Sequence, residues 1–284
     1  MADFDPWAPP ATGTVQQVAA AVWRIVAPNP SPLTGPGTNT YVVGTERPVV
    51  IDPGCDDTGH LGRVLEVAGG VVSRIVCTHS HPDHSPGAVP LQAATGAPIL
   101  GAPSGPHARE DSRFTPDRTM LHGERLQVGD TTLRAIHTPG HASNHLCFLM
   151  EEDRLLLSGD HINNGQTVVI NPPDGNMHAY MKALHELLEE PIDYILPAHG
   201  WVLGFAHQAI RQLIEHRLVR ERKVLHGVRV RGPATIDELL PVVYDDVDPI
   251  LYPVAARSLL AHLEKLVIDG MVGREYGDRW AATA

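Results

Sequence analysis

The sequence Thr-His-Ser-His-Pro-Asp-His at residues 78–84 constrains the fold of this chain more than any other segment. It places His79, His81, Asp83 and His84 in one loop, directly after the strand-like segment 74–77. Imidazole and carboxylate groups are ligands for divalent metal ions. Four of them within six residues are more than one ion usually takes from one loop, so we expect two ions to share this HxHxDH run.

Further candidate ligands follow three later apolar segments, each at the point where a strand would end. Segment 133–137 leads to His141, segment 154–157 leads to Asp160, and segment 192–196 leads to His199. Each of these side chains stands beside a glycine in a turn. Each segment therefore offers one imidazole or carboxylate at its exit.

The candidate ligands occur in a fixed order: the HxHxDH run, a single His, a single Asp and a final His. This order resembles the ligand pattern of the metallo-β-lactamase-fold hydrolases. The resemblance implies two metal sites. The first would use His79, His81 and His141, and the second would use Asp83, His84 and His199. Asp160 would bridge the two ions, because its two oxygens can each bind one ion and hold the pair roughly 3.5 to 4 Å apart.

Other histidines do not fit this pattern, and we expect them to be surface or core residues. They are His60, His107, His122, His185, His207, His216, His226 and His262.

Short β-branched segments alternate with helical ones up to about residue 205. The expected strands are 15–27, 40–44, 49–51, 74–77, 124–128, 131–137, 145–150, 154–158 and 193–196, and the expected helices are 59–68, 87–95 and 176–189. Because the second half repeats the theme of the first, we predict an α+β fold, a four-layer αβ/βα sandwich. The ligand loops should gather at one edge, where the two sheets meet.

The pattern changes after residue 205. A helix over 206–225 should precede a second helix, begun by a T-x-x-E capping box of Thr235 and Glu238. A third helix over 252–269 stops at Gly270, and residues 271–280 form a hairpin around Gly277. This order is a winged-helix outline. We therefore predict a catalytic domain over residues 1–205 and a small winged-helix-like domain over 206–284.

The C-terminal domain narrows the resemblance to the β-lactamase-like protein 2 group. Segments 35–41 and 138–145 and the run 215–221 carry it together with that domain. The resemblance implies two substrate classes, because animal members are endoribonucleases of single-stranded RNA and many bacterial relatives carry only a general hydrolase label. Kinship of fold does not fix the substrate.

The net charge of −11 argues against broad electrostatic capture of a polyanion. Positive charge is nevertheless concentrated between residues 211 and 231. The cations there are Arg211, Arg217, Arg220, Arg222, Lys223, Arg229 and Arg231, against Glu215 and Glu221. We favour a solvated helix face for this stretch, with a phosphate-binding surface as the alternative.

We expect no targeting or membrane segment. Residues 1–23 contain no Lys or Arg and several prolines, unlike a secretory signal or transit peptide, and no apolar run approaches the length that crosses a bilayer. Cys77 and Cys147 lie in apolar runs and Cys55 follows a turn, and we expect all three thiols to be reduced. The expected location is the cytoplasm.

The predicted activity is hydrolysis of a small carbonyl substrate (ester, thioester, lactone or related amide) by a hydroxide that bridges two divalent ions. Zinc is the favoured metal, with iron or manganese as alternatives. The alternative activity is a metal-dependent endoribonuclease or phosphodiesterase on single-stranded nucleic acid. β-Lactamase activity is less favoured, because β-lactamases of this fold do not use a bridging aspartate at the position of Asp160. The terminal domain would serve packing or dimerisation, which allows a homodimer.

Asp83 is the predicted catalytic residue, since a carboxylate beside the metals can bind the second ion and also orient the nucleophile or transfer its proton. Asp52 either accepts the free N–H of a ligand histidine or caps its own turn. Weaker candidates for substrate contact, each explained equally well by strand packing or turn formation, are Asn39, Tyr41, Asn144, His145, Asn163 and Asn164.

Overall fold

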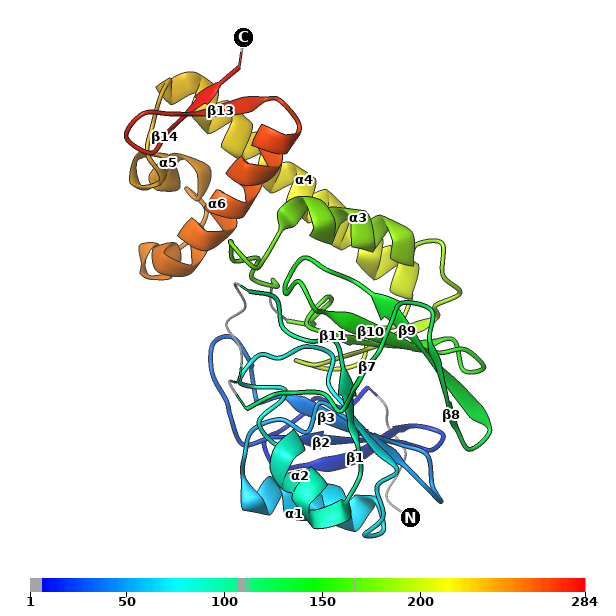
Figure 1. Ribbon diagram of the computed structural model, residues 1–284. Coiled ribbons are helices and arrows are strands. Elements are labelled where there is room, and N and C mark those ends of the chain that lie inside the picture. The colour runs from blue at the N-terminus through cyan, green and yellow to red at the C-terminus, as the bar shows by residue number, and fades with distance from the viewer. Residues whose placement is uncertain (1–6, 107–110, 112, 166, 284) are drawn as a thin grey trace.

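The computed structural model describes residues 7–106, 111, 113–165 and 167–283, and two β-sheets form its centre. The first sheet contains β1 (Val15–Ala19), β2 (Val22–Val26), β3 (Asn39–Val43), β4 (Val49–Ile51), β5 (Arg74–Val76), β6 (Ile99–Gly101) and β7 (Arg118–Thr119), side by side in that order. Strands β1 to β4 pair antiparallel and β4 to β7 pair parallel. Helices α1 (Thr58–Val67) and α2 (Ala88–Thr95) cover its outer face, where Val64 and Leu91 join the buried strand residues (Figure 1).

The second sheet has five strands in the order β12-β11-β10-β9-β8. They are β8 (Arg125–Val128), β9 (Thr131–His137), β10 (Leu146–Met150), β11 (Leu155–Gly159) and β12 (Tyr194–Pro197). Strands β8 to β11 pair antiparallel, whereas β12 is parallel to β11. Helices α3 (Met177–Leu187) and α4 (Ala206–Arg231) cover the outer face through Tyr180, Leu184 and Ile210.

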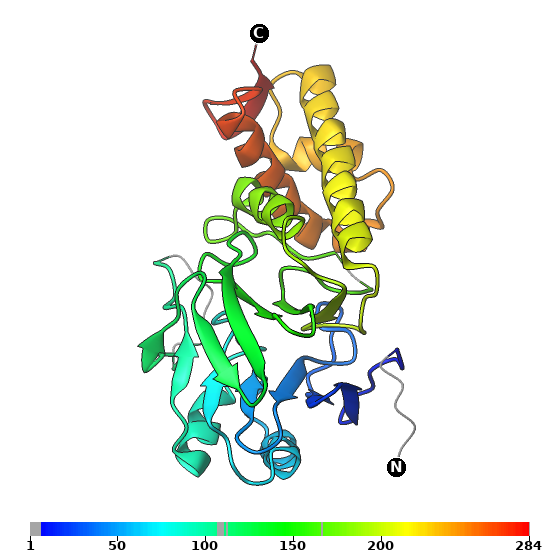
Figure 2. The same cartoon turned by 90° about the vertical axis from the view of Figure 1, so that its right-hand side faces the viewer.

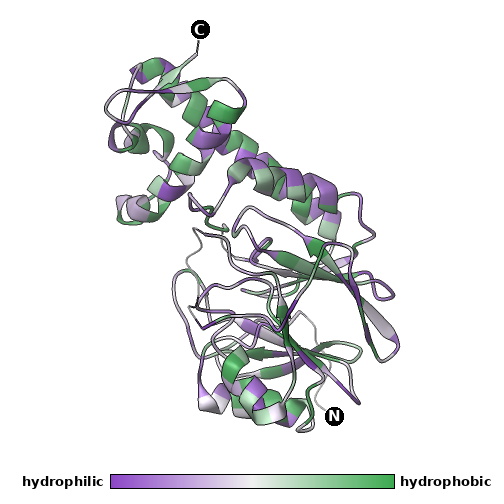
Figure 3. Cartoon of the chain, viewed as in Figure 1, coloured by the Kyte–Doolittle hydropathy of each residue, from purple (hydrophilic) through white to green (hydrophobic). Residues whose placement is uncertain are grey.

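Apolar side chains fill the space between the two sheets. Ile51 and Val76 of the first sheet share one buried cluster with Leu133, Phe148 and Leu157 of the second. Helix, sheet, sheet and helix are thus stacked as four layers, which confirms the predicted αβ/βα sandwich (Figure 1). Hydrophobic and hydrophilic residues alternate around α3 and α4, as in helices that bury one face (Figure 3). No helix in the described part of the chain is both long and apolar enough to cross a membrane.

The predicted single strand 15–27 is wrong. It is two strands, β1 and β2, which pair antiparallel around a turn in which Ala21 has a φ of 53°. Alternating patterns do not reveal such a reversal when its turn consists of alanines rather than glycine or asparagine. Strands β6 and β7 were not predicted, because three and two residues are too few to show a period.

The C-terminal part has a core of its own. It contains α5 (Ile236–Val243), a 3₁₀ turn at Pro249–Leu251, α6 (Tyr252–Ile268), β13 (Val272–Glu275) and β14 (Arg279–Ala282). The last two strands form an antiparallel hairpin, so the winged-helix outline is confirmed.

Helix α4 joins the two parts of the molecule. It is 26 residues long, which corresponds to about 39 Å, and rises out of the sandwich into the terminal part (Figure 2). Its first half packs on the sandwich through Ile210 and Ile214, and its second half enters the terminal core through Val224 and Val228. Because one helix belongs to both cores, the predicted domain division at residue 206 stays a prediction.

The topology brings the candidate ligand loops to one edge. Strands β4 and β5 are parallel, and so are β11 and β12, so the loops that follow them emerge on one side of each sheet. Backbone hydrogen bonds join the sheets there, from Leu146 N to Thr78 O (2.8 Å) and from Asn39 N to Ala198 O (2.8 Å). These bonds fix the HxHxDH loop and the loop before His199 against the opposite sheet.

The capping box at the start of α5 generates a stability prediction. The Thr235 hydroxyl accepts a hydrogen bond from the Glu238 N–H, and the Glu238 carboxylate accepts one from the Thr235 N–H. Thr235→Ala should lower the free energy of unfolding by about 1 kcal/mol, measured by urea denaturation. Thr235→Ser keeps the acceptor oxygen and should lose much less. Equal losses in both variants would contradict a capping role.

Candidate metal centre

The structure brings all seven predicted ligands together at this edge of the sandwich. They form two groups, each with donor atoms that lie within 4.8 Å of one another. One group consists of His79, His81 and His141, and the other of Asp83, His84, Asp160 and His199. This division places each residue as the sequence pattern suggested, with Asp160 in the second group.

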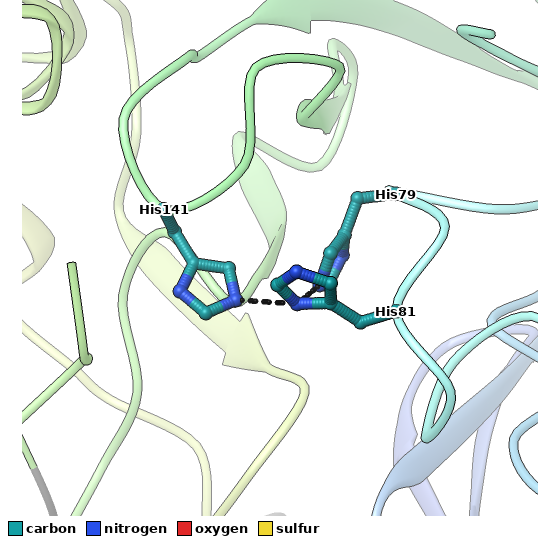
Figure 4. A group of neighbouring side chains, drawn as sticks. All are labelled: His79, His81 and His141. Carbon is teal, nitrogen blue, oxygen red and sulfur yellow. Dashed lines mark hydrogen bonds between the residues drawn. The ribbon is translucent and has the colours of Figure 1, made fainter. Parts of the chain in front are cut away.

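The first group is a set of three imidazoles that point at one another (Figure 4). His79 and His81 come from the loop after β5, and His141 comes from the loop after β9. The Nε2 atoms of His79 and His141 each lie 2.9 Å from Nδ1 of His81. Three ring nitrogens from two sheets therefore face one small volume.

Hydrogen bonds on the far side of the rings decide which nitrogens carry protons. The Thr78 hydroxyl donates to Asp52, so Nδ1 of His79 must donate to Oγ1 of Thr78, 3.0 Å away. Nδ1 of His141 donates to the carbonyl of Val169 at 2.8 Å. With their protons on Nδ1, His79 and His141 each present a lone pair at Nε2. Both lone pairs point at Nδ1 of His81, which can donate at most one proton to the two of them. A cation at this place would satisfy both lone pairs.

Burial keeps the rings of His79 and His81 neutral. It lowers the pKa of His79 well below the ordinary value, and neighbouring rings, beginning with His84, lower it further. Burial followed by the proximity of His141 lowers the pKa of His81 to about 3. Neutral imidazole is the form that binds metal.

The second group combines two carboxylates with two imidazoles. Nε2 of His199 lies 3.1 Å from Oδ1 of Asp160 and 3.3 Å from Oδ2 of Asp83. Nε2 of His84 lies 3.6 Å from the same two oxygens. Its Nδ1 donates to Asp52 at 2.9 Å, and its Nε2 is a buried atom without a hydrogen-bond partner among the described residues. Burial lowers the pKa of His84, yet Asp83, Asp160 and Asp52 raise it well above the ordinary value. A buried nitrogen without a partner, placed between carboxylate oxygens, fits either a proton or a metal cation.

The charges in the second group require compensation. Burial opposes ionisation of Asp160, but His199 and His84 hold its pKa well below the ordinary range. Burial lowers the pKa of His199, yet Asp160 and Asp83 raise it to about 9. The pKa of Asp83 falls to about 2, because His84 and His199 outweigh the opposing effect of burial. Buried carboxylates thus stay ionised and attract either protons or metal cations.

Asp160 faces both groups. Its Oδ1 lies near His199, while its Oδ2 lies 3.3 Å from Nε2 of His141. Its backbone N–H donates to Nε2 of His145 at 3.0 Å. Gly159 precedes it with a φ of 51°, and a Cβ there would lie 2.6 Å from the same His145 nitrogen. The turn therefore needs glycine, and His145 holds the carboxylate between the two groups.

Asp52 supports the site from behind. Besides His84, it accepts hydrogen bonds from the N–H and the hydroxyl of Thr78, at 2.7 and 2.8 Å. It is 2% exposed, and its φ of 48° is unfavourable for a residue with a side chain. The expected bond to a histidine of the HxHxDH run is confirmed, and the same carboxylate also holds the backbone of that loop. The role of Thr78, which stands directly before the run, was not predicted.

Most of the weaker candidates support loops. Asn39 and Tyr41 donate to the carbonyl of Pro197, and Asn144 donates to Ser80 and Ala102. Asn164 donates to the carbonyl of Trp201. Asn163 is different, because it donates to Oδ1 of Asp160 at 3.0 Å and also lines the pocket at the site. Contacts between loops thus explain four of the six candidates, whereas His145 and Asn163 both bond Asp160.

The histidines expected outside the pattern belong to neither donor group. His60 is buried and bonds the Thr40 hydroxyl, and His262 is buried near Glu221. His107 lies outside the described residues.

A pocket of about 330 Å³ opens over the two donor groups. His81, Asp83, His141 and Asp160 form its floor. The walls are largely apolar and include residues that sequence patterns did not single out. The wall residues are Leu33, Pro82, Asn163, Thr167, Val168, Val169, Asn171, Pro172, Pro173, Asp174 and Arg257. Residues 167–173 form no helix or strand, so no periodic signal marked them.

Family models match most of the chain. The metallo-beta-lactamase superfamily model matches residues 33–199, and the beta-lactamase associated winged helix domain matches residues 235–280. The beta-lactamase-like protein 2 homolog of Drosophila melanogaster is 30% identical, over 90% of this chain and 91% of its own length. An atrochrysone carboxyl ACP thioesterase of Aspergillus novofumigatus is 29% identical, over 91% of this chain and 82% of its own.

Solved structures share the fold. A beta-lactamase domain protein from Burkholderia ambifaria has a TM-score of 0.81 at 22% identity, over 96% of this chain and 95% of its own. The protein TTHA1623, solved in a di-iron-bound form, has a TM-score of 0.54 at 28% identity, over 66% of this chain and 96% of its own.

Metal stoichiometry tests the two groups. The purified protein should bind two divalent ions per chain, measured by plasma mass spectrometry after dialysis. His141→Ala and His199→Ala should each lose one ion and keep the other, because each removes a donor from a different group. Asp160→Ala should weaken the binding of both ions. His226→Ala, an exposed control on α4, should keep two ions. Loss of only one ion in Asp160→Ala would contradict a shared carboxylate.

Asp52 generates a second prediction. Asp52→Asn removes the charge that orients His84, so zinc affinity in a chelator competition should fall by about 10- to 100-fold. Asp130→Asn changes an exposed turn and should leave the affinity unchanged. Unaltered affinity in Asp52→Asn would restrict Asp52 to holding its turn.

Proposed function

Because this chain belongs to the metallo-β-lactamase superfamily of hydrolases, we propose that it is a dinuclear metal-dependent hydrolase of small carbonyl substrates, thioesters first. One observation carries the proposal. Both donor groups face a single compact pocket of about 330 Å³ whose walls are mostly apolar. Such a pocket suits the acyl part of a small molecule.

The proposed cofactors are two divalent ions, with zinc favoured by the mixed imidazole and carboxylate donors and iron or manganese as alternatives. When bound, such a pair lowers the pKa of a water to near 7 and polarises a carbonyl oxygen. TTHA1623, solved with two irons, supports a dinuclear site in this fold.

The chain's own residues supply the remaining parts of the chemistry. The Asp83 side chain is 30% exposed, whereas those of His84 and His199 are 0% and 1% exposed. Asp83 thus lies closest to substrate within the second group, where its ionised carboxylate can accept a proton from water and pass it to the leaving group. Asn163 orients Asp160, and Val168 and Val169 exclude water from the acyl part.

The relatives favour a thioester. The fungal protein that is 29% identical is a thioesterase by its name, and its similarity spans the sandwich and the terminal part alike. A thiolate is a better leaving group than an alkoxide or an amine. It therefore needs little proton transfer from a general acid such as Asp83.

Nuclease activity is the second candidate, and the charge distribution disfavours it. The cations between residues 211 and 231 do not line the pocket, and several are neutralised. The ion pairs are Arg220 with Asp246, Arg222 with Glu215 and Lys223 with Asp245. Arg217 is buried, contrary to the expected solvated face, and donates to the carbonyl of Val168, whereas Arg211, Arg229 and Arg231 are exposed. A strand of nucleic acid would need a continuous positive groove.

Three finer features belong to the same proposal. The location is the cytoplasm, the terminal part permits a homodimer, and β-lactam hydrolysis is at most a side activity because Asp160 stands at the bridging position.

A substrate panel tests this function. Kinetics with a butyryl thioester, a lactone, a chromogenic β-lactam and a single-stranded oligoribonucleotide should give the highest kcat/KM for the thioester. A chelator should abolish this activity and zinc should restore it. Asp83→Ala should lower kcat/KM by about 10²- to 10⁴-fold, and Asp130→Asn should not. Cleavage of RNA alone would replace the proposal with a nuclease.

A further inference from the structure

The terminal part contributes one charged side chain to the pocket. Arg257 lies on α6, more than fifty residues beyond the last candidate ligand in sequence, yet it lines the same pocket as His81, Asp83, His141 and Asp160. It is the one cation among the residues that line this pocket in the described part of the chain. A guanidinium carries a positive charge and five N–H donors.

Arg257 stands without a polar partner in the part of the chain that the structure describes. It is half-buried, and it makes neither a hydrogen bond nor an ion pair with any other residue within the described ranges. Four other arginines of the terminal part are paired. These pairs are Arg220 with Asp246, Arg222 with Glu215, Arg274 with Asp278 and Arg279 with Glu238. A half-buried guanidinium without a partner loses part of its hydration without compensation, so an anion that enters the pocket would gain a ready donor.

Among the described residues, three carboxylates line the pocket, and each has other partners. Asp83 and Asp160 belong to the candidate metal centre, where they lie near His199. Asp174 accepts hydrogen bonds from the hydroxyl and the N–H of Ser143, at 2.5 and 3.2 Å. The other wall residues include apolar Leu33, Val168 and Pro173, which cannot balance a positive charge.

Helix α6 is fixed on the sandwich. Ala261, one turn beyond Arg257, is buried in the cluster that α3 and α4 form with the second sheet. Lys265 on α6 pairs with Glu221 on α4 at 3.0 Å. The helix that carries Arg257 is therefore packed against the sandwich and paired by charge with α4, so its position over the pocket is preset.

From this arrangement we propose that Arg257 selects substrates that carry an anionic group, such as a carboxylate, separated from the reacting carbonyl by an apolar segment. The proposal rests on the proposed hydrolase function and adds the class of acyl group. The reacting carbonyl lies at the candidate metal ligands, the apolar segment contacts Val168 and Pro173, and the distal carboxylate accepts two parallel hydrogen bonds from the guanidinium. Arg257 is a specificity-determining residue that touches no reacting atom.

Matched substrates test the selection. Thioesters of N-acetylcysteamine with adipyl, pimelyl and suberyl groups carry a terminal carboxylate, and their terminal carboxamides are neutral isosteres. The wild-type protein should prefer the best carboxylate over its amide by about 10- to 100-fold in kcat/KM, the range expected for hydrogen bonds to a charged group. Arg257→Gln should remove this preference and leave the amides unchanged. Arg257→Lys, which keeps the charge without the fork, should retain part of it.

Binding provides a readout that is independent of turnover. Calorimetry with the free dicarboxylates, their monoamides and the matching phosphono acids should show the same preference for a second anionic group, with and without added zinc. A stronger response to the phosphono acids would identify phosphate rather than carboxylate as the natural group. Arg229→Gln, on the exposed face of α4, serves as the control, and circular dichroism and metal content verify the fold of each variant.

The outcomes separate the two proposals. Hydrolysis of acids and amides at equal rates, or equal losses for both in Arg257→Gln, would overturn the role of Arg257 and leave the hydrolase intact. Absence of thioester hydrolysis, together with binding of dicarboxylates that depends on Arg257, would overturn the hydrolase and support the anion site.

Discussion

Burying imidazoles and carboxylates at the edge of two apolar sheets is the constraint on which this molecule depends. Each such group loses hydration, and only hydrogen bonds or opposite charge offset that loss. The arrangement meets this need in two ways. The far nitrogens of His79, His84 and His141 have hydrogen-bond partners, while the near nitrogens and the carboxylates of Asp83 and Asp160 face one another as a cation site would require.

Strain and glycine placement follow from that constraint. Asp52 adopts a left-handed backbone conformation, which costs on the order of 1 kcal/mol or more. Its carboxylate accepts three hydrogen bonds that hold the HxHxDH loop. Gly159 turns β11 sharply beneath His145 and so places Asp160. The backbone departs from regular conformations where the site requires it. The packing of the two sheets behind the site offsets the free energy of these conformations.

The terminal part is more than an appendage in this arrangement. Helix α4 shares its residues between two cores, and Arg217 near its middle donates to Val168 in the pocket wall. Helix α6 places Arg257 at the same pocket. The winged-helix part thus contributes to the wall of a compact, mostly apolar pocket, and most of its cations are paired with its own acids. Membership of a fold family does not by itself predict such an arrangement.

The sequence by itself determined the layered fold and the seven candidate ligands, because strand periodicity, the capping box of Thr235 and Glu238, and a dense HxHxDH run are local patterns. It left open whether Asp52 accepts a hydrogen bond from a ligand histidine. It did not predict the turn at Ala21, the hydrogen bonds of Thr78 to Asp52 or the pocket wall over 167–173. Those features depend on which surfaces meet across large sequence separations. Only the tertiary structure decided that Arg257 of the terminal part would face His81 and Asp83 in one pocket, since no local pattern encodes the docking of α6 on the sandwich.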